Sequence, residues 1–316
     1  VKVVRQIGAG DYRTRPGRFN TEEFSTLAAE IARMGSDLEH RERDRAAHLE
    51  KARLLQEHLL PHFKSGPVPS SAVVYRPADT VAGDYYDLLP LSDGSLLACM
   101  ADVCGHGVPA AMGAAILKAL VFAAAERTTS PAAMLRSINE RFLRVSLPGD
   151  FASMVLVRIV ATSGAGGVIE YASAGHEPCF LLRASGTLQR LDQSGILLGI
   201  SQGEDWVDRQ LDVSPADLLV LLTDGVTEAM DATRRQFGRE RLVTQLAALA
   251  GSSPGEIARS IVAAVDLHCG HPSAVADDQT LVVLDLHALS VEWKKAGGRE
   301  AGLSAVSAAG DSTGAV

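Results

Sequence analysis

The segment Leu97-Ala-Cys-Met-Ala-Asp-Val-Cys-Gly-His-Gly-Val-Pro-Ala-Ala111 combines the signals of a strand, a turn and a helix. It begins as an apolar run, which predicts a buried strand, and the acid Asp102 follows. Glycines flank His106, and Pro109 stands in the first turn of an Ala-rich segment that predicts a helix. A carboxylate that ends a buried strand lies at the edge of a sheet and faces a cleft. The alternative is an ordinary strand, turn and helix with a solvated aspartate.

Similar patterns on both sides of this stretch predict an α+β fold. Strands are expected at 72–75, 85–91, 95–101, 151–160, 168–171, 179–182, 187–191, 205–211, 218–222 and 280–286, and helices at 108–126, 131–145, 239–250 and 254–268. Hairpin and Gly/Ser turn signals separate many of the strands, and the helices come in pairs instead of alternating with strands. This order favours antiparallel sheets covered by helices.

The composition excludes several classes of protein. With 316 residues, 47% of them hydrophobic, the chain can build a sizeable core, and its net charge of −8 argues against a nucleic-acid partner. The four cysteines show no CxxC spacing, which favours reduced, buried thiols over disulfides or zinc ligands. No uninterrupted apolar run approaches the roughly 18 residues that a membrane helix needs, so we expect no membrane span in this chain.

Residues 1–62 carry a different helical pattern. Leu27, Ile31, Met34 and Leu38 recur at spacings of four, three and four, which predicts a coiled-coil seam. The alternative is one long solvated helix, because charged residues interrupt the seam further along the chain.

The same segment resembles the second half of a HAMP domain. The matching residues are the turn Gly8-Ala-Gly-Asp-Tyr12, a polar connector, and Thr21-Glu-Glu-Phe24 leading into the seam. HAMP domains usually follow a transmembrane helix and relay signals as parallel dimers, so the resemblance implies a homodimer through the N-terminal helix. We expect a cytoplasmic protein, tethered to the inner face of the membrane if a longer chain carries a span upstream.

Aspartates recur at predicted strand ends in the rest of the chain. They are Asp84, Asp102, Asp224 and the pair Asp277-Asp278. If these strands share one end of a sheet, the carboxylates converge, repel one another and need cations to stay ionised. Several Asp ligands without a His/Cys set favour Mg²⁺ or Mn²⁺ over zinc, and two such ions can activate a water and clamp a phosphoryl oxygen. The alternative is ordinary turn chemistry.

Six motifs identify a known family. They are Leu55-Gln-Glu-His-Leu-Leu-Pro61, Arg76-Pro-Ala-Asp-Thr-Val-Ala-Gly-Asp-Tyr-Tyr-Asp87, Ala101-Asp-Val-Cys-Gly-His-Gly-Val-Pro-Ala-Ala111, Ala172-Ser-Ala-Gly-His-Glu-Pro178, Leu222-Thr-Asp-Gly-Val-Thr-Glu-Ala229 and Asp277-Asp-Gln-Thr280. On the basis of these motifs, residues 56–287 resemble the SpoIIE/RsbU serine/threonine phosphatases of the metal-dependent (type 2C) superfamily. The resemblance implies an antiparallel β-sandwich with helices on both faces, and a PPM-type enzyme that uses two Mn²⁺ or Mg²⁺ ions.

The resemblance also implies a set of metal ligands. Asp84 and Asp102 would bind the ions, with Asp102 bridging them, and the backbone carbonyl of Val103 would add an oxygen. Asp224 and Asp277 would complete one coordination sphere. A metal-bridged water would then attack phosphorus, which agrees with the lack of a cysteine-nucleophile signature.

Other residues near these motifs have less defined roles. Asp278 is the less favoured ligand of its pair, because the ligand in the superfamily precedes a polar residue. His106 could be a general acid, a phosphate contact or a structural residue. The same roles are open to His176, for which the structural role is favoured. Ala82 replaces a usual glycine, which is tolerated unless the position needs a positive φ. Asp87 contributes at most indirectly.

The sequence therefore predicts five segments. They are a partial HAMP-like segment (1–40), a coiled-coil signalling helix (41–62), a linker (63–69), the phosphatase domain (70–287) and a disordered tail (288–316). The family resemblance implies hydrolysis of phosphoserine or phosphothreonine on a STAS-type anti-sigma-factor antagonist, and we expect the N-terminal helix to control this activity. The alternatives are an inactive binding module with this fold and a hydrolase of small phosphate esters.

Overall fold

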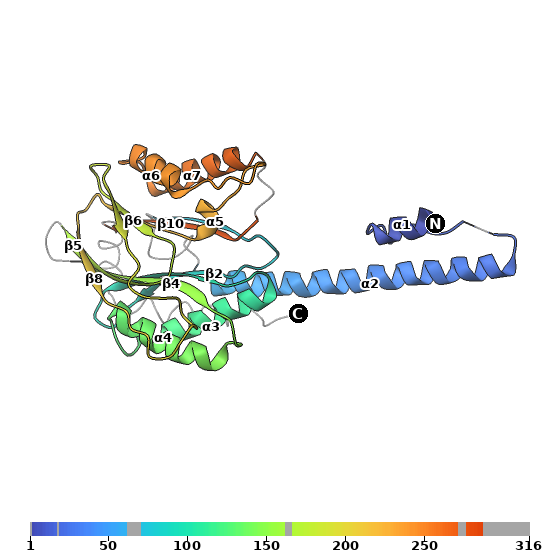
Figure 1. The fold of residues 1–316 in the computed structure, drawn as a ribbon, viewed down its shortest axis with the longest axis horizontal. Helices are drawn as coiled ribbons and strands as arrows, with labels where there is room; N and C mark the ends of the chain where they lie inside the picture. The colour runs from blue at the N-terminus through green and yellow to red at the C-terminus, as the bar shows by residue number, and fades with distance from the viewer. Residues whose placement is uncertain (1, 18, 62–70, 162–165, 271–275, 287–316) are drawn as a thin grey trace, which may run out of the picture. The chain divides into compact units, whose positions relative to one another are not determined.

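The computed structural model describes residues 2–17, 19–61, 71–161, 166–270 and 276–286. The chain divides into two compact units, residues 1–55 and 56–316, shown as ribbons in Figure 1. Helix α2 (Glu22–Leu59) begins in the first unit, and its last turn belongs to the second. The helix runs unbroken across the predicted boundary at residue 40, while the predicted linker and tail lie outside the described residues.

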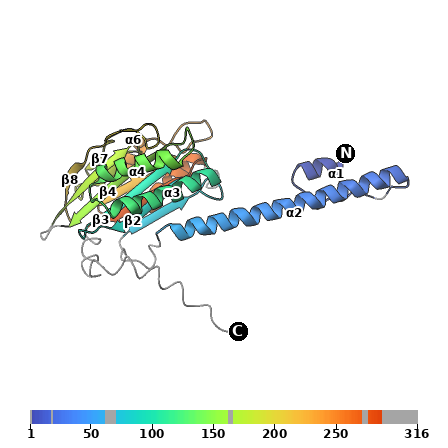
Figure 2. The same cartoon turned by 90° about the horizontal axis from the view of Figure 1, so that it is seen from below.

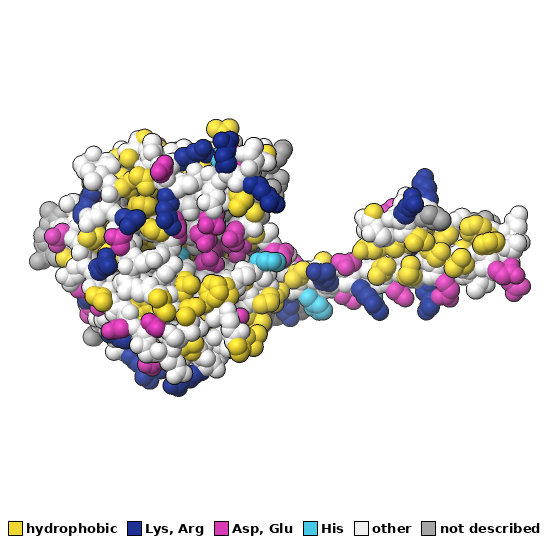
Figure 3. Space-filling model, in the orientation of Figure 1, with side chains coloured by type: hydrophobic (Ala, Val, Ile, Leu, Met, Phe, Trp, Pro, Cys, Tyr) yellow, Lys and Arg dark blue, Asp and Glu magenta, His cyan; other side chains and the backbone are white. Residues whose placement is uncertain are grey.

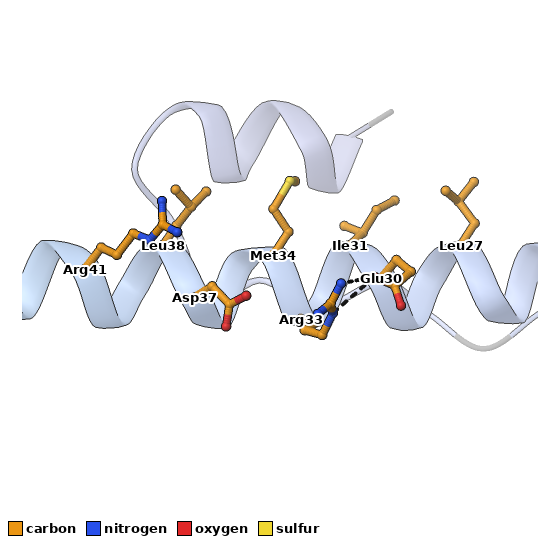
Figure 4. Close-up of a pocket in the computed structure, with 8 residues that line it drawn as sticks. All are labelled: Leu27, Glu30, Ile31, Arg33, Met34, Asp37, Leu38 and Arg41. Carbon is orange, nitrogen blue, oxygen red and sulfur yellow. Dashed lines mark hydrogen bonds and ion pairs between the residues drawn. The ribbon is translucent and has the colours of Figure 1, made fainter.

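The first unit consists of α1 (Lys2–Gly8), a connecting segment, and α2 as far as residue 55. The two helices approach closely at Gly35, where a Cβ atom would lie 3.3 Å from the Ile7 side chain and 3.2 Å from the Tyr12 carbonyl oxygen. The predicted seam of α2 faces α1, and with its neighbours it lines a groove of about 500 Å³ (Figure 4). Because Leu27 and Met34 remain 54% and 45% exposed, α1 covers the seam only in part.

The second unit is built on two five-stranded antiparallel sheets. In spatial order the first sheet contains β1 (Ser71–Arg76), β10 (Gln279–Asp285), β9 (Leu218–Leu222), β6 (Cys179–Leu182) and β7 (Leu188–Leu191). The second contains β2 (Asp84–Pro90), β3 (Leu96–Val103), β4 (Ala152–Ala161), β5 (Gly167–Ala174) and β8 (Arg209–Val213). Alternate apolar residues of both sheets, such as Met100, Leu219 and Val282, form one core between them.

Helices cover the outer face of each sheet (Figures 1 and 2). α3 (Val108–Ala125) and α4 (Pro131–Val145) pack on the second sheet, and α6 (Arg239–Ala248) and α7 (Pro254–Cys269) pack on the first. The predicted β-sandwich with helices on both faces is therefore confirmed.

The structure differs from the sequence analysis at α5 (Asp224–Thr227) and at the start of β8. This short helix was not predicted, and β8 begins at Arg209 instead of 205. The residues before β8 leave the sheet because Trp206 is buried and its indole N–H donates to the Ile196 carbonyl, 3.1 Å away. All four cysteines are free; Cys99 and Cys179 are buried as expected, whereas Cys104 and Cys269 are partly exposed.

Among the described residues, α3 is the one helix that is long and apolar enough to cross a membrane by length and composition, and Lys118 interrupts its apolar run. Its inward face packs into the core through Ala110, Ala114, Leu117 and Val121.

Candidate metal centre

Two predicted ligands lie opposite each other at one end of the second sheet. Asp84 begins β2, Asp102 stands near the end of β3, and the two are directly paired in the antiparallel register. The hairpin turn at Ser92-Asp93-Gly94 sets this register, since the loop length fixes which residues face each other. Asp84 is buried, and Asp102 is partly exposed.

Asp84 is held by two hydroxyl groups, one just after β9 and one in β10. Its Oδ2 accepts hydrogen bonds from Thr223 (2.9 Å) and Thr280 (2.5 Å), which adjoin the two other acidic motifs. Its Oδ1 is buried and has no hydrogen-bond partner among the described residues. A buried carboxylate oxygen without a donor is costly, so this oxygen is suited to a cation.

The structure distinguishes the two acids of the Asp277-Asp278 pair. Asp278 is buried, and its two carboxylate oxygens accept the backbone N–H groups of Ala78 (2.7 Å) and Gly83 (2.6 Å). Asp277 is exposed, and its Oδ1 accepts the Asp278 N–H at 2.9 Å. Asp278 therefore anchors the loop that precedes Asp84, whereas Asp277 keeps an oxygen with no hydrogen bond among the described residues.

Two glycines allow backbone segments to meet at this end of the sandwich. A Cβ on Gly225 would lie 2.0 Å from the Asp278 carbonyl oxygen, and one on Gly83 would lie 2.7 Å from the Val103 carbonyl oxygen. Larger residues would push these segments apart. Ala82 does not have a positive φ, so alanine is compatible with the backbone there.

The carboxylates influence one another electrostatically. Burial, followed by the charges of Asp224, Asp277 and Asp278, raises the pKa of Asp102 to about 8. Burial and then Asp277 raise the pKa of Asp224 to about 6. Burial raises the pKa of Asp84 well above its usual range, and Asp102 raises it further. Protons are therefore favoured at this end in the absence of cations.

The acidic side chains lie near one another, but they do not converge on one metal position. In the part of the chain that the structure describes, no three His, Cys, Asp or Glu side chains are arranged so that they could hold an ion as they stand. The donor chemistry nevertheless fits a hard cation, because every acid offers oxygen and one buried oxygen has no other partner.

The two candidate histidines differ. His106 is exposed in the loop between Gly105 (φ 91°) and Gly107 (φ 72°), and its side chain has no hydrogen bond within the described ranges. His176 is buried, and its Nδ1 shares a hydrogen bond of 2.7 Å with the hydroxyl of Ser153, the residue paired with Asp102 in the register. Burial lowers the pKa of His176 to about 4, so a neutral ring supports the sheet here.

Asp87 lies away from the acidic end, where it forms a buried ion pair with Lys118 of α3. Sequence reasoning missed Thr223 and Thr280 as supports of Asp84. Their positions beside the acidic motifs were the available signal, but threonine is also common in strands, so the pattern did not single them out.

Part of the chain, mostly in the second unit, matches a known family. The sequence profile of the family described as Stage II sporulation protein E (SpoIIE) matches residues 92–287. The phosphoserine phosphatase RsbU of Bacillus subtilis is 34% identical over 154 residues, which are 48% of this chain and 44% of RsbU. Protein IcfG of Synechocystis is 29% identical over 225 residues, 63% of this chain and 36% of IcfG. The chain thus spans less than half the length of these relatives.

A solved structure supports the same fold. The SiaA-PP2C domain of Pseudomonas aeruginosa superposes with a TM-score of 0.68 and 23% identity, covering 78% of this chain and 98% of that domain. The chain belongs to the SpoIIE family, and its second unit has the PP2C phosphatase fold. The HAMP resemblance of the first unit stays a prediction.

Proposed function

We propose that this chain is a metal-dependent protein serine/threonine phosphatase. The observation that carries the proposal is the buried, unpartnered Oδ1 of Asp84, which lies beside acids that raise one another's pKa. An inactive binding module would gain stability by losing these carboxylates, since a repelling, desolvated cluster is costly. The name of the relative RsbU, a phosphoserine phosphatase, supports the same activity.

The ligand set that we propose comprises the side chains of Asp84, Asp102, Asp224 and Asp277 and the backbone carbonyl of Val103. The ions they would hold are two Mn²⁺ or Mg²⁺, which when bound lower the pKa of a water and neutralise charge on the phosphoryl group. Asp278 is not a ligand in this proposal, because both its oxygens accept backbone N–H groups.

Other residues of the chain position this set. Thr223 and Thr280 fix the orientation of the Asp84 carboxylate by donating to one of its oxygens. Asp278 fixes the backbone from Ala78 to Gly83, immediately before Asp84. His106 is exposed two residues after Cys104, so it can contact the phosphate or the leaving oxygen without moving buried groups.

We further propose a phosphorylated STAS-type anti-sigma-factor antagonist as the substrate, on the basis of family membership. The partly exposed seam of α2 supports a homodimer, because apolar residues repeated every seven positions need a partner helix. Control by the helix is supported at its last turn, where Gln56, Leu59 and Leu60 line a small cavity together with Asp84 and Lys118.

The test compares substrates under defined metal. The purified chain is treated with a chelator, resupplied with Mn²⁺ or Mg²⁺, and assayed on a serine-phosphorylated STAS-domain protein from the same genome and on p-nitrophenyl phosphate. We expect metal-dependent release of phosphate from both, faster from the protein, and its loss in Asp102→Asn. Hydrolysis of the aryl phosphate alone would favour a small-ester hydrolase, and no hydrolysis under any metal would favour a binding module.

A further inference from the structure

A group of large apolar side chains remains exposed beside the acidic centre. The residues of this apolar rim are between 38% and 73% exposed, and they are Val108, Met112, Val145, Leu147, Phe151 and Ile200. Single exposed apolar residues are ordinary, but a cluster of this size marks an interaction surface. Figure 3 shows acidic side chains gathered on this face, with hydrophobic side chains directly below them on the side of α3 and α4.

Hydrogen bonds connect the rim to the centre. The Phe151 carbonyl accepts the backbone N–H of Cys104 at 3.0 Å, only two residues after Asp102. The next residue along, Ala152, is paired with Val103 in the register. The turn that presents Leu147 is closed by reciprocal bonds with Asp150, whose carboxylate and N–H bind the Leu147 N–H and carbonyl at 3.0 Å each.

The helices bring the remaining rim residues to the same end. α3 and α4 form an antiparallel pair joined by a short connection, so the first turns of α3, with Val108 and Met112, lie at the same end as Val145, the last residue of α4. Ile200 joins them through Gly199, where a Cβ would lie 3.2 Å from the Phe151 Cα.

The position of the rim and the charge of its neighbour Arg144 indicate the occupant. Any protein that delivers a phosphorylated side chain to Asp102 brings its own surface over the residues that border Asp102, whereas a small ester does not reach them. The exposed Arg144 next to Val145 has no ion pair within the described residues, and it complements an acidic or phosphorylated partner.

We propose that the apolar rim is the docking surface for the phosphoprotein substrate, and that it selects a folded protein whose phosphoserine or phosphothreonine is bordered by exposed apolar side chains. This inference rests on the proposed function. It assigns substrate selection to α3, α4 and the following loops, and it leaves the chemistry to the acids.

The test introduces one charge into the rim at a time, in the full-length chain with Mn²⁺ present. Met112→Glu and Leu147→Glu are assayed on the phosphorylated STAS-domain protein and on p-nitrophenyl phosphate. We expect the ratio of kcat/KM for the protein to kcat/KM for the aryl phosphate to fall at least tenfold, through KM. The control is Leu267→Glu on α7, since Leu267 is 85% exposed and lies outside the rim, and it should leave the ratio unchanged.

Each outcome has a separate meaning. If the unmodified chain hydrolyses neither substrate, the proposed function fails and the docking inference fails with it. If both substrates are hydrolysed and the rim variants keep the wild-type ratio, the docking inference alone is overturned. It is also overturned if the variants keep the ratio and change only the sedimentation behaviour, because the rim would then join copies of this chain. Circular dichroism confirms that each variant is folded.

Discussion

Gln56 and Ala82 are joined by two reciprocal hydrogen bonds. The side-chain amide of Gln56, in the last turn of α2, donates to the Ala82 carbonyl at 2.7 Å, and its Oε1 accepts the Ala82 N–H at 3.0 Å. Ala82 is fully buried and stands two residues before Asp84. The side chain of Gln56 thus satisfies both backbone groups of a residue that adjoins the acidic centre.

Gln56→Leu should weaken metal activation. The substitution leaves the buried N–H and carbonyl of Ala82 without partners, at a cost of about 1–3 kcal/mol for each group. The loop should then shift so that the N–H and carbonyl of Ala82 find new hydrogen-bond partners, and this shift moves Gly83 and Asp84. We expect the Mn²⁺ concentration for half-maximal activity to rise roughly tenfold, the equivalent of about 1.4 kcal/mol. Gln210→Leu, at an exposed position of β8, is the matched control; an unchanged Mn²⁺ requirement for Gln56→Leu would refute the coupling.

Asp84→Asn should stabilise the metal-free protein and abolish its response to metal. Replacing a buried carboxylate that other acids repel removes a destabilising charge. We expect the Tm of the chelator-treated protein to rise by about 2–4 °C for each kcal/mol recovered. Added Mn²⁺ should raise the Tm of the wild type but not of the variant. Asp217→Asn is the contrast, because Asp217 is buried and paired with Arg183, and its loss should lower the Tm.

The metal-free protein should become less stable as the pH rises. The folded pKa values of Asp102 and Asp224, about 8 and about 6, lie above the value near 3.9 expected in the unfolded chain. The folded state therefore binds more protons between about pH 4 and pH 8, and this contribution to stability is lost as pH rises through that window. Denaturant melts at pH 5 and pH 8 measure the difference. Asp102→Asn should flatten the slope, and a slope of opposite sign would disprove the assignment.

Lys118 and Asp87 should behave as an obligatory pair. Lys118 is the charged residue of the otherwise apolar helix α3, and the side chain of Asp87 is almost fully buried. Lys118→Met leaves a buried carboxylate unpaired and should cost about 3–5 kcal/mol of unfolding free energy. Adding Asp87→Asn should recover much of the loss. Urea denaturation of the two single variants and the double variant gives the coupling energy, and additive losses would show that the pair is not coupled.

Leu38→Glu should weaken self-association of the chain. Leu38 lies on the α2 seam that α1 covers only in part, and a charge there opposes close packing of helices. Sedimentation equilibrium should show a larger dimer dissociation constant for the variant. Ser36→Glu, at an exposed position of the same helix, serves as the control. A wild-type chain that sediments as a monomer would rule out the homodimer.

The sequence predicted local features well because they depend on local periodicity. β6, β9 and α4 have the predicted bounds, since their apolar patterns end at clear turn or cap residues. α4, for example, begins after Ser130, whose hydroxyl accepts the Ala133 N–H. The pairing of Asp84 with Asp102 also follows from a local hairpin.

Contacts between distant segments could not be read from the sequence. The anchoring of Ala78 and Gly83 by Asp278 joins positions about 200 residues apart, and no periodicity reports it. The exchange of hydrogen bonds between Gln56 and Ala82 is of the same kind. In the sequence, the choice of Asp277 over Asp278 rests on a family resemblance, and the structure supplies a physical reason for it in the two occupied oxygens of Asp278.

The place of β10 in the first sheet has a consequence for biosynthesis. This strand lies between β1 and β9, so the first strand of the sandwich gains its neighbour only when the last strand has been made. The same late segment brings Asp277, Asp278 and Thr280 to Asp84. Pairing of such distant segments follows translation of the whole domain. A nascent chain on the ribosome therefore lacks Asp277 and the Thr280 hydroxyl that binds Asp84 until the final strand has been made.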